Sequence, residues 1–176
     1  LEHVRAQDRL MASAMSLPQL VRYHAVAFQV LAGLLPRMGP AEAGETLARL
    51  RADRDRMRKL ADHCPENFLH LVLTMDAELA RLDGRAEEAL GLYDAAIEAA
   101  RSSEYLRDEA VANELAARHL LALGRRKAAE GYVRAAAGLF ERWGAHRKVW
   151  QLEAEHPRIF ERLAARRRGA GRPSSA

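Results

Sequence analysis

The feature that most constrains the fold of this chain is a repeat in its second half. The stretch "LDGRAEEALGLYDAA", residues 82–96, aligns with "LGRRKAAEGYVRAA", residues 123–136. The matched positions, 40 residues apart, are Gly84 with Gly124, Ala89 with Ala129 and Ala96 with Ala136. Each unit therefore predicts two antiparallel helices joined by a glycine turn, with alanines where the helices approach closely and Tyr93 filling the gap between them.

The composition supports a helical fold throughout. Hydrophobic residues make up 49% of the 176 positions and charged residues 30%, and strong helix formers dominate. Runs rich in β-branched and aromatic residues, which are typical of strands, are absent. We predict an all-α fold in which antiparallel helix pairs stack as a tetratricopeptide-like superhelix. The usual period of such repeats is ~34 residues, so the helices of this longer repeat should be a little longer than usual. An irregular helical bundle is the alternative, and the joint agreement of one glycine and two alanines favours the repeat.

Three segments follow from the pattern. Residues 1–64 are expected to form N-terminal helices that continue the helical array, and residues 65–157 the tetratricopeptide-like repeats. Residues 158–176 are predicted to be a basic, disordered tail, which carries a net charge of +5 against −1 for the rest of the chain. The tail has arginines for contact with nucleic acid or an anionic membrane, but it lacks interleaved aromatic residues, which favours a solvated segment.

Two further features suggest where the protein works. No apolar run approaches the ~18 residues that a membrane span needs, so no transmembrane segment is predicted. The chain has a single cysteine, which excludes an internal disulfide and fits a reducing compartment. We therefore expect a cytoplasmic location.

The stretch "HCPENFLH" places Cys64 between two histidines and raises the question of a metal or thiol site. Zinc sites usually have paired ligands at short spacing with a second pair further on, and no second pair exists here. We interpret the stretch as a junction between helices, with Cys64 a small buried residue, Pro65 in the first helical position and Glu66 near the positive end of the helix dipole. No catalytic, cofactor-binding or metal-ligating residue is predicted.

The aromatic residues are predicted to lie in the core. Trp143 and Trp150 are seven positions apart, a spacing that favours packing of one helix face into the interior over contact with a partner. The other aromatic residues expected in the core are Tyr23, Phe28, Phe68, Tyr93, Tyr132 and Phe140.

Several longer motifs together resemble one protein family. They are "LADHCPENFLH", "AELARLDGRAEEALGLYDAAIEAARSSEYLRDEAVANELAARHLLALGR" and "FERWGAHRKVWQLEAEHP", which follow one another between Leu47 and Pro157. They resemble the helical repeat region of very large bacterial signalling proteins. Those proteins join a serine/threonine-kinase-like domain, an AAA-type ATPase, the repeat region, a GAF sensor and often the histidine kinase of a two-component system.

The resemblance covers only the repeat region, so it implies none of the family's enzymatic activities for this chain. The sequence has no G-x-x-x-x-G-K-[ST] loop to hold a nucleotide, and no H-R-D or D-F-G kinase motif. The resemblance implies a non-catalytic scaffold for protein–protein interaction and signal transmission, with the neighbouring ATPase, sensor or kinase domains as partners. A helical array that senses a small-molecule ligand, as in ATPase-type regulators, is the alternative, and nucleic acid is not expected as a partner.

A concave binding face is the site that this fold predicts. In such stacks the first helix of each pair lines the concave side, which places Thr74, Glu78 and Arg81 on it in one unit, and Glu114 and Arg118 in the next. Their charges suit a peptide or a regulatory ligand. The spacing also predicts simpler ion pairs within a helix, Glu78 with Arg81 and Glu114 with Arg118. We therefore predict the face as a region, with these pairs as its structural alternative.

Overall fold

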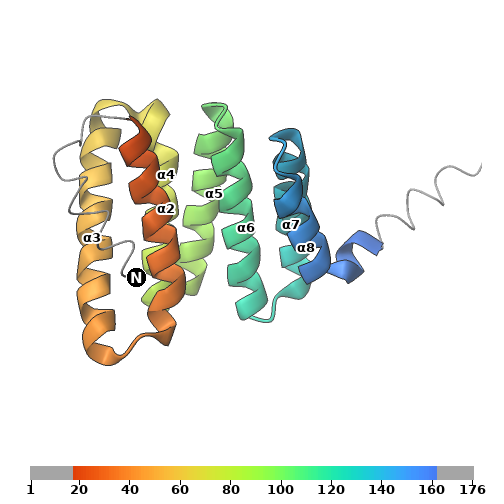
Figure 1. Cartoon of the computed structure of the whole chain (residues 1–176), viewed down its shortest axis with the longest axis horizontal. Helices are drawn as coiled ribbons and strands as arrows, with labels where there is room; N and C mark the ends of the chain where they lie inside the picture. Colours follow the sequence, from red (N-terminus) through yellow and green to blue (C-terminus); the bar gives the residue numbers. More distant parts are fainter. Residues whose placement is uncertain (1–17, 162–176) are drawn as a thin grey trace, which may run out of the picture. The chain divides into compact units, whose positions relative to one another are not determined.

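In the part of the chain that the structure describes, residues 18–161, every regular element is helical (Figure 1). This computed structural model contains α2 (Pro18–Leu34), the 3-10 helix η1 (Leu35–Arg37), α3 (Pro40–His63), α4 (Pro65–Leu82), α5 (Ala86–Ser102), α6 (Leu106–Ala122), α7 (Arg126–Arg142) and α8 (His146–Glu155). The predicted all-α class is confirmed, and the superhelical stacking stays a prediction. None of the helices described is both long and apolar enough to cross a membrane.

Proline determines where several helices begin. Pro18, Pro40 and Pro65 are the first residues of α2, α3 and α4. A proline suits this position because its missing N–H is one that the helix leaves unpaired in any case. The predicted role of Pro65 in the "HCPENF" junction is confirmed.

Left-handed residues determine where the later helices end. Gly84, Glu104, Gly124 and Gly144 have φ angles of 76°, 60°, 75° and 82°. They are spaced 20 residues apart, so the 40-residue repeat of the sequence contains two equivalent turns. The sequence pattern shows only the longer period because the turn between α5 and α6 carries glutamate in place of glycine.

The same hydrogen bond closes each of the three glycine turns. The N–H of the residue after the glycine donates to the carbonyl five positions earlier, an arrangement that satisfies a carbonyl the helix end leaves open. The pairs are Arg85 with Ala80 at 2.9 Å, Arg125 with Leu120 at 2.9 Å and Ala145 with Phe140 at 2.8 Å.

The chain divides into two compact units between Ser103 and Glu104. In the first unit, α4 packs against α2, α3 and α5, and in the second, α7 packs against α6 and α8. The core of the first unit is built by Phe28, Leu31, Leu50, Met57, Val72 and Met75, and that of the second by Ala110, Ala136, Leu139, Phe140 and Leu152. This division falls inside the range 65–157 predicted for the repeats, and that range stays a prediction.

The repeated alanines are all fully buried. Ala89, Ala96, Ala129 and Ala136 are 0% exposed, and so is Tyr93 between the first two. A side chain of one carbon lets two helices approach closely, so the burial predicted from the repeat is confirmed at these positions.

The basic tail begins later than the sequence indicates. Residues 157–161 are helical, and the half-buried Phe160 packs against the core of the second unit. The prediction of disorder is therefore wrong for residues 158–161, because an apolar side chain anchors them. The rest of the predicted tail, residues 162–176, and residues 1–17 at the other end lie outside the described part.

Two of the predicted core aromatics are exposed instead. Trp143 and Trp150 are 49% and 66% exposed, so their assignment to the core is wrong. A separation of seven places two residues on one face only within a continuous helix, and the left-handed Gly144 separates α7 from α8. Of the remaining aromatics, Phe28, Tyr93 and Phe140 are buried, and Tyr23, Phe68 and Tyr132 are half-buried.

Glu104 allows a test of the turn geometry. Glycine should suit its φ of 60° better, so Glu104→Gly is expected to raise the free energy of unfolding by about 0.5–1 kcal/mol. As the matched control, Gly124→Ala should lower it by about 1 kcal/mol through backbone strain alone, because an added Cβ meets no atom within 4 Å. Urea unfolding of both variants measures this, and a loss of stability in Glu104→Gly would contradict the assignment.

Candidate functional site

Thr74 and Glu78, two of the five residues predicted on the concave face, lie inside the first unit. Thr74 is 7% exposed, and its hydroxyl donates a 2.8 Å hydrogen bond to the carbonyl of His70 in the same helix. Glu78 is 3% exposed. The expectation that these two side chains are available to a partner is wrong, because α4 buries this part of its surface against its neighbours.

The carboxylate of Glu78 is held by Tyr93 of α5 and by Arg81 of its own helix. The Tyr93 hydroxyl of α5 donates a short hydrogen bond to Oε1 of Glu78. Arg81 Nη2 donates to Oε2 at 2.7 Å and also to the carbonyl of Ala32 in α2 at 3.2 Å. A buried carboxylate is tolerated only when it is paired in this way, so the group serves to connect α2, α4 and α5.

Tyr93 is fixed in its role as a donor. Burial raises the pKa of the Tyr93 hydroxyl above its ordinary value, and the neighbouring Glu78 carboxylate raises it further. Both effects disfavour a phenolate next to a carboxylate, so the hydroxyl keeps its proton and continues to donate.

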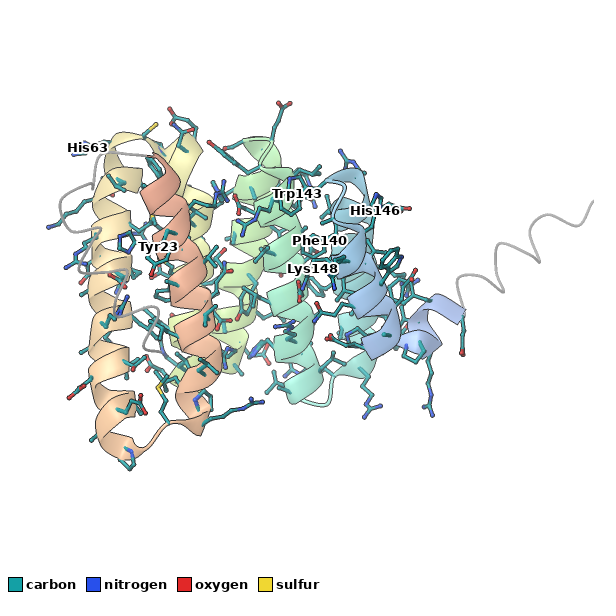
Figure 2. All side chains as sticks on the ribbon, in the orientation of Figure 1. Tyr23, His63, Phe140, Trp143, His146 and Lys148 are labelled. Carbon is teal, nitrogen blue, oxygen red and sulfur yellow. The ribbon has the colours of Figure 1, made fainter. Side chains whose placement is uncertain are left out.

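The second unit contains a comparable carboxylate, that of Glu114. Its side chain is 7% exposed and accepts hydrogen bonds from Arg118 at 2.5 Å and from Lys148 of α8 at 2.8 Å. Lys148 also lies 5.4 Å from the centre of the Phe140 ring (Figure 2). Lys148 thus attaches α8 to α6 and α7 through one ion pair and one cation–π contact.

Arg81 and Arg118 are the predicted residues that remain accessible. Their side chains are 25% and 53% exposed, although each also pairs with a glutamate in its own helix. The predicted pairs between residues three and four apart are confirmed. The concave face as a region stays a prediction.

Three contacts that organise these residues were missed from the sequence. Tyr93, Ala32 and Lys148 lie 15, 49 and 34 positions from the residues they contact. Helical spacing identifies partners only within one helix, so no local signal pointed to them. The alignment of Tyr93 inside a helix pair gave its burial but not its hydrogen bond.

Arginines on α3 form further ion pairs within the first unit, with aspartates in α4 and at its end. Asp76 of α4 is held by Arg54 at 3.3 Å and Arg58 at 2.6 Å. Asp83, at the end of α4, lies 3.4 Å from Arg51. Each ion pair joins α3 to α4, so these charges also serve packing.

Cys64 is polar and partly exposed, which corrects the prediction of a buried apolar residue. Its Sγ donates to Oε1 of Glu66 at 3.2 Å and accepts from the Asn67 amide at 2.9 Å. The hydrogen bond to Glu66 raises the pKa of the Cys64 thiol, with smaller contributions from desolvation and from the negative charge of that carboxylate. A raised thiol pKa lowers the fraction of reactive thiolate, which is the opposite of what a nucleophile requires.

A metal centre finds no support in the geometry. Within residues 18–161 no group of three or more His, Cys, Asp and Glu side chains is arranged to hold a metal ion.

No family model, curated protein or solved structure matches the chain. The likeness to the repeat region of bacterial signalling proteins therefore rests on the sequence motifs alone.

The contact between Tyr93 and Glu78 can be tested by a double-mutant cycle. Tyr93→Phe removes one donor from a buried carboxylate and should lower the free energy of unfolding by about 1.5–3 kcal/mol. In a Glu78→Gln background the same change should lower the free energy of unfolding by a smaller amount, because the charged acceptor is gone. Chemical unfolding of the four proteins measures the difference, and an equal cost in both backgrounds would refute the contact.

The environment of Cys64 predicts its reactivity. Glu66→Gln should lower the thiol pKa and so speed alkylation by iodoacetamide at pH 8, where the thiol is mostly protonated. Asn67→Ala should slow the reaction, because the hydrogen bond from Asn67 lowers the pKa in the parent. Mass spectrometry of timed samples follows the rate, and changes in the opposite directions would sink this interpretation.

Proposed function

We propose that this chain is a non-catalytic helical-repeat module for protein–protein interaction and signal transmission. It acts within or alongside a bacterial sensor protein that contains kinase-like, ATPase and GAF domains. The proposal rests on the motifs between Leu47 and Pro157 and on the helical organisation that accompanies them.

The observation that carries the proposal is the regularity of the later helices. The helices α5, α6 and α7 each contain 17 residues, and left-handed turns recur every 20 positions. Repeated helix pairs of one length are the building units of solenoids, which present extended surfaces to other proteins.

The use of the polar side chains adds support. Glu78 and Glu114, the acidic groups expected to meet a ligand, are buried and paired with residues of neighbouring helices. Small-molecule sites instead have a few convergent polar groups that point into a cavity. This use of the carboxylates favours a scaffold over the alternative of a ligand-sensing array.

A binding experiment with two candidate partner domains tests the proposal. We expect calorimetric titration of the chain with the ATPase or the GAF domain of a signalling protein that carries an "HCPENF"-type repeat region to give saturable binding. Arg118 is the more exposed of the two accessible arginines on the predicted face, so Arg118→Glu should weaken binding at least tenfold. Arg126→Glu, an exposed arginine at the start of α7, is the matched control and should have little effect.

Two results would contradict the proposal. Absence of binding to either domain would remove its central claim. Equal weakening by both arginine variants would show that charge in general, and not the predicted face, governs the contact.

A further inference from the structure

The helix α8 has an unusual distribution of charge. In α4, α5 and α6 an acidic residue lies in the first turn and a basic residue in the last, as the helix dipole favours. In α8 the order is reversed, since it starts with His146, Arg147 and Lys148 and ends with Glu153 and Glu155. The charges in the first and last turns of α8 do not offset the helix dipole, so this charge order does not stabilise the isolated helix.

One side of α8 carries an exposed tryptophan. Trp150 is 66% exposed, the highest value among the exposed large hydrophobic residues of the described chain. Arg147, Glu153 and Ala154 are three or four positions away on the same side of the helix, and all are exposed. Arg147 and Glu153 form no ion pair with any residue in the range 18–161.

The repeat register indicates what this side of the helix normally does. Trp150 lies 40 residues after Ala110 and 80 after His70, and those two side chains are 0% and 2% exposed. Ala110 packs in one cluster with Ala136 and Phe140 of α7. The equivalent face is therefore a helix-packing face in α4 and α6, but it is exposed in α8.

We propose that this face of α8 binds the same face of a second copy of the chain, with the two α8 helices antiparallel. In that arrangement the basic half of each helix meets the acidic half of the other, twice, by symmetry. The acidic half lies beside the positive end of the opposite helix dipole, so the reversed charge order becomes favourable. A parallel pair would place like charges together.

The contact has an apolar centre and charged ends. Trp150 lies near the middle of α8, so the two copies of Trp150 approach the symmetry axis, where Ala154 leaves space for the indole ring. Tryptophan is a common anchor of protein interfaces. A single ten-residue helix buries little area, so we expect a weak dimer with Kd on the order of tens of micromolar. This inference goes beyond the proposed function and does not depend on it.

Sedimentation equilibrium of the full chain tests the dimer. The mass should rise from 19.6 kDa toward twice that value as the concentration increases. Trp150→Ala should remain monomeric at every concentration. Trp143→Ala is the matched control because this tryptophan is also exposed but lies at the end of α7, beside Arg107, and it should dimerise like the parent.

Charge reversal separates the interface from any effect on folding. The variants His146→Glu with Arg147→Glu, and Glu153→Arg with Glu155→Arg, each give α8 one dominant sign and should abolish self-association. Both reversals agree with the helix dipole, so neither should lower the melting temperature. An equimolar mixture of the two variants should form a heterodimer.

Each alternative outcome overturns the proposal. A parent that stays monomeric at its highest soluble concentration refutes it directly. A dimer that survives Trp150→Ala, or that both charge reversals leave intact, places the interface elsewhere. Failure of the mixed variants to associate rules out the antiparallel arrangement.

Discussion

A left-handed residue every 20 positions is the constraint on which the later helices depend. Each such residue follows the end of one helix, and in the glycine turns the N–H of the next residue donates to the carbonyl five positions earlier. Because the turns recur at a constant interval, α5, α6 and α7 have equal lengths, and equivalent side chains return to equivalent places. The fully buried alanines at 89, 96, 129 and 136 are a direct result.

Buried carboxylates determine how the helices attach within each unit. Glu78 receives hydrogen bonds from α5 and from an arginine that also binds the backbone of α2, and Glu114 receives a lysine from α8. Such groups are costly to bury alone but bind neighbouring helices specifically when they are paired. This arrangement uses the acidic residues of the predicted binding face for packing and leaves Arg81 and Arg118 as its accessible charges.

The side of α8 that carries Trp150 is exposed because none of the described helices covers it. The repeat explains why this side is suited to helix packing, and the reversed charge order explains why an antiparallel copy would suit it. Figure 1 shows α8 beside α7, and Lys148 on its inner side is already bonded to Glu114. The two sides of this short helix thus have separate roles, one in the core of its unit and one in the proposed contact.

The sequence by itself determined the features that depend on local chemistry. Helix formers, prolines at positions 18 and 65 and the glycines at positions 84 and 124 fixed the helical class and several helix ends, because each acts through its own backbone. The 40-residue repeat gave the buried alanines, and helical spacing gave the ion pairs of Glu78 and Glu114 with their arginines. Only the tertiary structure decided which polar groups are buried and which tryptophans are exposed. Tyr93 reaches Glu78, and Lys148 reaches Glu114, across separations of 15 and 34 residues that no periodicity encodes. Trp143 and Trp150 are exposed because the turn at Gly144 changes the direction of the chain, and with it the side that each residue faces.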